Sequence, residues 1–179
     1  PHLAVRFVQS DPGFGLNPKV ANLRGALVRA RHDLVLQSDA NVRISKGYLA
    51  RIVAELEDED AALLTSIVVG TGERTIGAAL ENLQLTAMIA PSVCTALHVA
   101  GVSCVIGKSM LMRRSELDRV GGLESVRDIL CEDFVLGRAY QEAGLKVVLS
   151  TNTLENVNHD TTVEQFFSRH ARWMKMRVV

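Results

Sequence analysis

Short apolar runs alternate along this chain with stretches in which apolar residues recur every three or four positions. The runs predict strands over residues 3–9, 32–37, 62–69, 105–112 and 146–150. The helical spacing predicts helices over residues 18–31, 45–60, 75–90, 115–120, 132–143 and 163–179. Asn17-Pro18 reads as an N-cap followed by proline at the first helical position. Alternating strands and helices indicate an α/β domain, and on this ground alone a mainly parallel sheet.

Composition narrows the class of protein. A chain of 179 residues with 47% hydrophobic and 22% charged residues fits one domain spanning residues 1–179. Its formal net charge is 0, so no overall basic field argues for a nucleic-acid partner. The three cysteines, Cys94, Cys104 and Cys131, lack metal-ligand spacing, which favours reduced thiols and a cytosolic location. Pro1 is not an initiator methionine and the final residues continue a helical pattern, so we expect a piece of a longer protein.

An uncharged stretch runs from Asn82 to Gly107. Its length would suffice for a membrane span, but Pro91, His98 and Gln84 disfavour that interpretation. Three alternatives stay open: a floor under an apolar substrate, an interfacial segment facing a membrane, and plain core.

Two acidic motifs are candidates for chemistry. Asp39 and Asn41 follow a buried-type strand, where α/β sheets bind ligands, and can present two oxygens to a hard divalent cation. The same Asp-x-Asn is also ordinary turn chemistry. Glu132 and Asp133 stand at a helix start, where the helix dipole favours negative charge; a solvated capping pair is the simpler interpretation.

The last predicted helix is amphipathic, basic and aromatic. Such a helix can lie on an anionic membrane surface, or bind a diphosphate through arginine. Its aromatic and basic residues are Phe166, Phe167, Arg169, His170, Arg172, Trp173, Lys175 and Arg177.

Taken in order, the aspartate motif, Glu132-Asp133 and Arg169-x-x-Arg172-Trp173 resemble the signature of membrane-bound nucleotide-sugar glycosyltransferases of GT-A fold. The chain is most similar to the ceramide glucosyltransferase family, over nearly its whole length. The shared residues are Asn17-Pro18-Lys19, Asp39, Gly107, Ser109 to Arg113, Gly121-Gly122-Leu123, Glu132-Asp133, Ser150-Thr151, Gln165-Phe166, Ser168-Arg169 and Arg172-Trp173.

The resemblance implies a mixed, Rossmann-like sheet flanked by helices and transfer of a hexose, most simply glucose, from a UDP-sugar. The acceptor would be the primary hydroxyl of ceramide or a similar lipid, with inversion, in a membrane-associated protein whose active site faces the cytosol. Asp133 would be the general base and Glu132 its neighbour, the choice between the two remaining open.

The resemblance also implies a donor site. Asp39, with Asn41 and His159, would hold Mg²⁺ or Mn²⁺ on the diphosphate. Lys19 would face the donor phosphates. The remaining donor ligands expected are Arg169, Arg172 and Trp173.

Two departures from the family pattern matter. Asn41 stands where many glycosyltransferases carry a second aspartate, which leaves the choice of cation open. The first strands of the fold, which supply the uridine pocket, are absent, so we expect this piece, truncated at its N-terminal nucleotide-binding side, to be inactive in isolation.

Three rival interpretations remain. The acceptor could be a hopanoid or diacylglycerol. The chain could be a catalytically inactive lipid- or nucleotide-binding module. It could also be a soluble nucleotide-binding α/β domain, although no phosphate loop is recognisable.

Overall fold

The computed structural model describes residues 5–102 and 104–176. Its strands are β1 (Leu34–Ser38), β2 (Val42–Arg43), β3 (Leu63–Thr71), β4 (Ser109–Arg113) and β5 (Val147–Val157). Its helices are α1 (Pro18–Leu27), α2 (Tyr48–Asp58), α3 (Ile76–Gln84), α4 (Ala90–Ala100), α5 (Arg114–Arg119), α6 (Glu132–Glu142) and α7 (Val163–Met176). A π-helical turn, η1 (Leu85–Ile89), joins α3 to α4, and a 3-10 turn, η2 (Leu123–Val126), precedes α6.

The described strands form one sheet in the order β1-β4-β3-β5-β2. Only β3 and β5 pair in parallel, whereas β1–β4, β3–β4 and β2–β5 are antiparallel. The mixed sheet expected from the family resemblance is confirmed, and the mainly parallel sheet expected from alternation alone is wrong. Two of the antiparallel pairs arise because β4, inside the sheet, runs against both of its neighbours, and the third arises because the edge strand β2 runs against β5.

The strand predicted over residues 3–9 is not formed by its described part, residues 5–9. Val5 and Phe7 are 73% and 99% exposed, so the apolar alternation meets no partner strand. Residues 3 and 4 lie outside the described part. A second correction concerns β5, whose predicted strand ended at residue 150 but which continues to Val157 because it pairs with both β2 and β3.

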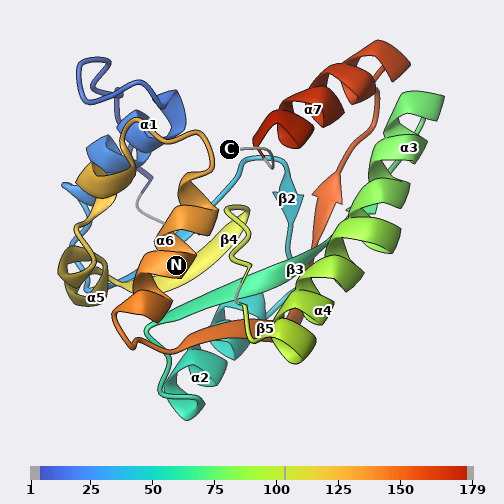
Figure 1. Cartoon of the computed structure of the whole chain (residues 1–179). Coiled ribbons are helices and arrows are strands. Elements are labelled where there is room, and N and C mark those ends of the chain that lie inside the picture. Colours follow the sequence, from blue (N-terminus) through green and yellow to red (C-terminus); the bar gives the residue numbers. More distant parts are fainter. Residues whose placement is uncertain (1–4, 103, 177–179) are drawn as a thin grey trace.

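Successive sheet residues point to opposite faces and build two cores. Leu63, Met110 and Met112 pack with α1, α5 and α6 on one face. Leu64 and Leu111 pack with α2 on the other. Figure 1 shows the sheet between these groups, with α3 and α4 running along the right of the view.

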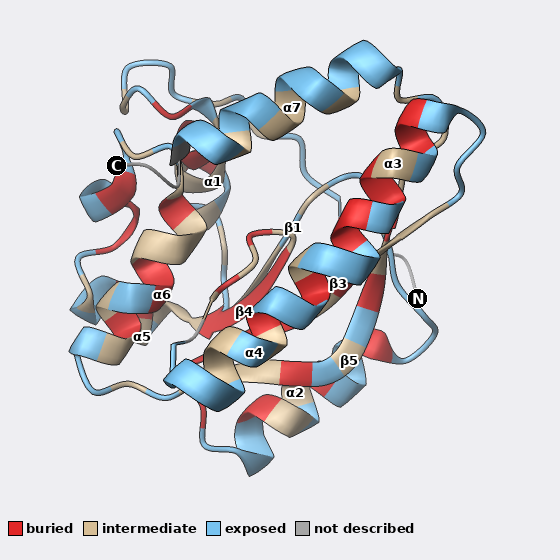
Figure 2. Cartoon of the chain, turned by 45° about the vertical axis from the view of Figure 1, so that its right-hand side comes forward, coloured by how far each residue is buried: buried red, intermediate tan, exposed pale blue. Residues whose placement is uncertain are grey.

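The uncharged stretch forms most of a continuous helical segment, Ile76–Ala100, that is long and apolar enough to cross a membrane by length and composition. The segment contacts β3, and Gly70 on that strand allows an approach so close that an added Cβ would lie 2.4 Å from the Asn82 Cα. Its opposite side is exposed, as Figure 2 shows for the alternating buried and exposed positions of α3. The large exposed apolar residues are Ile76, Leu83, Met88 and Val99. The expectation that this segment is simply part of the hydrophobic core therefore holds for only one of its sides.

Helix α7 leaves the neighbourhood of α3 and runs across the molecule towards α1 and α6 in both overall views (Figures 1 and 2). It contacts α3. This course directs the far end of α7 towards the side of the molecule that bears the candidate chemistry of α6.

Candidate functional site

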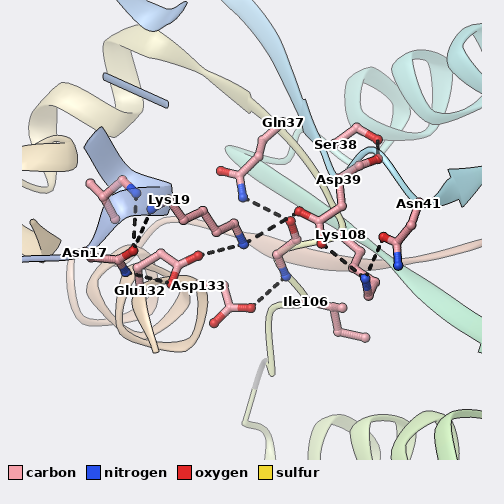
Figure 3. A network of polar contacts seen from close by, with 12 residues as sticks. Asn17, Lys19, Gln37, Ser38, Asp39, Asn41, Ile106, Lys108, Glu132 and Asp133 are labelled. Atoms are coloured by element: carbon pink, nitrogen blue, oxygen red, sulfur yellow. Dashed lines mark hydrogen bonds and ion pairs between the residues drawn. The ribbon is translucent and has the colours of Figure 1, made fainter. Parts of the chain in front are cut away.

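A polar cluster lies where the ends of β1, α1 and α6 meet the start of β4 (Figure 3). We call it the central cluster; its members are Asn17, Lys19, Asp39, Asn41, Gly107, Lys108, Glu132 and Asp133.

The N-terminus of α1 places the first members. The Asn17 side chain accepts hydrogen bonds from the backbone N–H groups of Lys19 and Val20, which confirms the predicted N-cap. The Asn17 amide also donates to the Ile129 carbonyl at 2.6 Å and to Glu132 Oε2 at 3.3 Å. One residue thus caps α1 and binds it to the start of α6.

The register of β1 and β4 places Asp39 beside Lys108. Ser38 lies opposite Ser109, and the next pair along is linked by the Asp39 N–H, which donates to the Lys108 carbonyl at 3.4 Å. The Lys108 Nζ then lies 3.1 Å from Asp39 Oδ2 and 3.1 Å from Asn41 Oδ1. The two oxygens that the sequence assigned to a cation therefore converge on one point, and an ammonium group lies there.

Lys19 joins the two acidic motifs. Its Nζ lies 2.7 Å from Glu132 Oε1 and 3.9 Å from Asp39 Oδ1. Burial acts to lower the pKa of Lys19, but the hydrogen bond to Glu132 and the charges of Glu132, Asp39 and Asp133 outweigh it and raise that pKa above its usual value. Lys19 therefore stays protonated through the physiological range.

Glu132 and Asp133 occupy different environments although they are adjacent. Glu132 is buried and held by Lys19 and Asn17. Asp133 is half-buried; its Oδ2 accepts the Gly107 N–H at 2.8 Å and its Oδ1 accepts the Phe134 N–H at 2.9 Å. The Cys131 thiol also lies 3.8 Å from Asp133 Oδ1, so Oδ2 is the Asp133 oxygen that keeps a second lone pair, whereas Glu132 is only 4% exposed. Of the two, Asp133 is the one placed to accept a proton from outside.

Gly107 is required for this arrangement. A Cβ at that position would lie 2.6 Å from the Lys19 Nζ and 2.8 Å from Asp133 Oδ2. The absence of a side chain lets the ammonium and the carboxylate share one small space. The Gly107 carbonyl is also held, because it accepts a 3.0 Å hydrogen bond from Gln37.

Cys131 lies beside the same carboxylates. Burial, together with the charges of Asp133 and Glu132, raises the pKa of its thiol to about 11. All three cysteines are free, as their spacing predicted.

His159 is the third expected metal ligand, and its Nδ1 lies 2.7 Å from the Gly72 carbonyl, which leaves Nε2 as the ring nitrogen available to a metal. Within residues 5–102 and 104–176, no three His, Cys, Asp or Glu side chains lie close enough together to hold a metal ion. Asp39 and Asn41 are the expected ligands whose side-chain oxygens the structure brings together.

The arginine motif of α7 is divided between two environments. Arg169 forms an ion pair with the buried Glu81 of α3, and burial, followed by the charge of Arg172, lowers the pKa of its guanidinium. Arg172 is exposed and Trp173 half-buried. An open hollow of about 410 Å³ lies along this side of α7 and is lined by Glu164, Gln165, Ser168, Arg169 and Arg172. Among the described residues, no hydrogen bond or ion pair joins α7 to the central cluster.

Two residues of these contacts, Lys108 and Glu81, were not among the functional residues expected from the sequence. Lys108 follows a glycine at the start of a strand, and only the strand register reveals that it faces Asp39. Glu81 had a detectable signal, since it is the last charged residue before the uncharged stretch and falls on the buried side of a helix.

Comparison with known proteins agrees with the expected family. The model of glycosyl transferase family 21 matches residues 1–179. Ceramide glucosyltransferase 1 of Caenorhabditis elegans is 30% identical over 179 residues, which cover 99% of this chain and 38% of that protein. Ceramide glucosyltransferase 3 of the same organism is 28% identical, over 92% of this chain and 36% of the relative.

A fungal relative extends the match. The ceramide glucosyltransferase of Pyricularia oryzae is 24% identical over 91% of this chain and 40% of its own length. The chain thus spans well under half of the curated relatives that it matches. With a family match along every residue and the mixed, helix-flanked sheet of a GT-A-like domain, the chain belongs to glycosyl transferase family 21.

Proposed function

We propose that this chain is the catalytic part of an inverting glycosyltransferase. It moves glucose or a related hexose from a UDP-sugar to the primary hydroxyl of ceramide or a similar lipid. The observation that carries the proposal is the meeting of Asp39 and Asp133, 94 positions apart in sequence, around the single ammonium group of Lys19. Family membership and the names of the relatives supply the substrate classes.

Asp133 serves as the general base. The second lone pair of its Oδ2 accepts the proton of the lipid hydroxyl as the hydroxyl oxygen attacks the anomeric carbon from the face opposite the leaving diphosphate. Such a base contributes about 10²–10⁴-fold to the rate. Glu132 holds Lys19 in place and takes no proton from the acceptor, because its carboxylate is buried beside Lys19 and Asn17.

The leaving UDP develops negative charge, which fixed cations stabilise. Lys19 stays protonated and lies on the inner side of the site. Arg172 and Trp173 bring a guanidinium and an aromatic face from α7. In this proposal they bind the outer end of the diphosphate.

Asp39 and Asn41 fit a Mg²⁺ or Mn²⁺ site. Their side-chain oxygens already converge on a positive charge, the Lys108 ammonium, which stands in for the cation. When bound, the metal would neutralise charge on the diphosphate. His159 remains the third expected ligand, through its Nε2, because its Nδ1 is bonded to the Gly72 carbonyl.

A lipid acceptor lies in a membrane, so the site must lie close to a membrane surface. The exposed apolar side of α3–η1–α4 supports an interfacial location, and α7 beside it carries basic and aromatic residues. Three free cysteines suit a site on the cytosolic face.

The proposal is tested by hexose transfer with the full-length gene product in detergent, supplied with UDP-glucose, Mn²⁺ or Mg²⁺ and a ceramide. Wild type is compared with Asp133→Asn, which keeps the shape of the carboxylate but cannot accept the proton. We expect transfer by wild type and a fall of roughly 10²–10⁴-fold in kcat for the variant. Donor binding, measured by calorimetry with UDP, should change little.

Other results would redirect the proposal. Transfer to a hopanoid or diacylglycerol but not to ceramide would change the acceptor. Intact transfer by Asp133→Asn would remove Asp133 as the base. Binding of UDP without transfer to any lipid would favour an inactive binding module.

A further inference from the structure

One side of α3 forms a seat for the start of α7. Gly77, Glu81 and Gln84 follow one another at helical spacing and are all buried. At Gly77 an added Cβ would lie 2.3 Å from the Thr162 carbonyl carbon, so the two segments touch backbone to backbone. The Thr75 hydroxyl, which caps α3, also binds the Thr161 carbonyl at 2.5 Å. These contacts fix where α7 begins.

Two side-chain contacts then fix how α7 is turned. Glu81 forms an ion pair with Arg169, and the Gln84 amide lies 2.7 Å from His170 Nδ1. Arg169 and His170 are consecutive, so both contacts act on the same turn of α7. Helix rotation and tilt at this turn are therefore set by α3.

The environment of Glu81 makes this ion pair sensitive to the loss of either partner. Its side chain is only 4% exposed, and its Oε2 has no hydrogen-bond partner among the described residues. A buried ion pair contributes little net stability, but removing one partner leaves the other charge uncompensated. A carboxylate buried at this position therefore indicates that the ion pair serves to fix the orientation of α7 relative to α3.

Arg169 is three residues before Arg172, on the same stretch of α7 and along the same hollow. Because Glu81 neutralises Arg169 and holds its turn, Arg172 one turn later is presented in a fixed direction with less repulsion from its neighbour. Helix α7 points from this seat towards the side of the molecule that bears α1 and α6 (Figures 1 and 2).

We propose that Glu81 is a positioning residue for hexose transfer: its buried carboxylate clamps Arg169 and orients α7, so that Arg172 and Trp173 face the donor diphosphate. This rests on the proposed function, which assigns those two residues to the donor. In this proposal Arg169, expected from the sequence to bind the diphosphate itself, is instead the residue through which Glu81 acts on α7. Because α3 belongs to the segment proposed to face the membrane, the contact between Glu81 and Arg169 couples that segment to the donor site.

The test compares Glu81→Gln, Arg169→Gln and the double variant in the full-length protein. The matched control is Glu142→Gln, the same substitution in the exposed Arg138–Glu142 ion pair of α6. If α7 contributes donor binding that is equal in the ground and transition states, misorientation raises KM and leaves kcat nearly unchanged. We expect the KM for the UDP-sugar to rise roughly ten- to a hundredfold in Glu81→Gln, with the control unchanged.

The double variant separates coupling from simple damage. Since Glu81 acts through Arg169, the double variant should be no worse than the more impaired single variant. If the increase in KM of the double variant equalled the product of the increases in the two single variants, the proposal would be overturned. So would a KM unchanged in Glu81→Gln when the melting temperature falls, because the residue would then have only a structural role.

Hydrogen exchange of residues 163–176 provides a readout that does not need activity. We expect faster exchange of this segment in Glu81→Gln and none of that change in Glu142→Gln. Absence of transfer by wild type would overturn the proposed function alone, and the exchange result would still decide whether Glu81 holds α7. Unchanged exchange would overturn the clamp.

Discussion

At the scale of single residues, the site consists of oppositely charged side chains in contact with one another. Lys19 lies among Glu132, Asp39 and Asp133, and Lys108 is held by Asp39 and Asn41. Gly107 makes room for the closest of these contacts. The chain therefore carries two ammonium groups where the family resemblance implies a metal ion and a diphosphate.

Lys108 should compete with a divalent cation for the oxygens of Asp39 and Asn41. Replacing it by Met in Lys108→Met removes that ammonium, so we expect Mn²⁺ to bind about tenfold more tightly, equivalent to about 1.4 kcal/mol. Electron paramagnetic resonance of free Mn²⁺ measures the affinity without any substrate. Lys146→Met is the control, because Lys146 pairs with Glu59 on an exposed surface away from the cluster. Equal affinities in wild type and Lys108→Met would show that no cation binds between these two oxygens.

At the scale of elements, a few side chains decide how helices dock on the sheet. Asn17 ties α1 to α6, Glu81 ties α3 to α7, and Glu55 ties α2 to β5. The Glu55 carboxylate accepts hydrogen bonds from the Ser150 hydroxyl, the Thr151 N–H at 2.9 Å and the Asn152 amide at 2.9 Å. Each tie is a short-range polar contact between segments far apart in sequence.

Glu55 should stabilise the fold in a pH-dependent manner. Burial acts to raise the pKa of Glu55, but the hydrogen bonds from Ser150, Thr151 and Asn152 outweigh it, and the pKa lies below its ordinary value of 4.5. Stability from this group is present above pH 4.5 and is lost as the pH falls through the folded-state pKa. Glu55→Gln should therefore lower the free energy of unfolding at pH 7 by about 1 kcal/mol, allowing for solvent screening, with a smaller difference at pH 3.

Urea unfolding at the two pH values measures this difference. Glu57→Gln is the comparison on the same helix, since the Glu57–Arg113 pair is exposed and a smaller loss at pH 7 is expected. A loss from Glu55→Gln that is as large at pH 3 as at pH 7 would contradict the assignment.

At the scale of the whole molecule, the apolar side of α3–η1–α4 and helix α7 lie together on one surface (Figure 2). The segment packs on β3 by one side only and exposes large apolar residues on the other. The π-helical turn η1 comes just before Pro91, where the missing proline N–H would otherwise interrupt the helix. The helix is thereby kept continuous along a surface suited to a lipid interface.

This surface should bind the 179-residue chain to vesicles that contain anionic lipid. Leu83→Ser with Met88→Ser removes two exposed apolar side chains, 63% and 60% exposed, that would enter the interface. We expect the partition coefficient in vesicle sedimentation to fall at least about tenfold, because burying each such side chain is worth about 1.5–3 kcal/mol. Leu16→Ser, at an 85% exposed site before α1, should bind as wild type does. Equal binding by all three proteins would exclude this surface as the membrane contact.

The sequence predicted the N-cap of α1 at Asn17 and the acidic start of α6 from local chemistry. It also predicted that four of the five described strands exist, although not how they pair. These features depend on neighbouring residues, so they can be recognised without a fold. The prediction failed for residues 5–9, whose alternation is that of a strand but which have no partner strand in the described sheet. A strand's existence depends on its partner.

The sequence by itself determined the helices other than α4 (Ala90–Ala100), the acidic motifs and the resemblance that led to the family. Only the tertiary structure decided which charges meet. The register of β1 and β4 put Lys108 on Asp39, the docking of α3 put Glu81 on Arg169, and the packing of two loops joined His159 to the Gly72 carbonyl. Those contacts join residues from about 70 to nearly 90 positions apart, and such pairings are set by how the strands and helices pack, which local patterns do not encode.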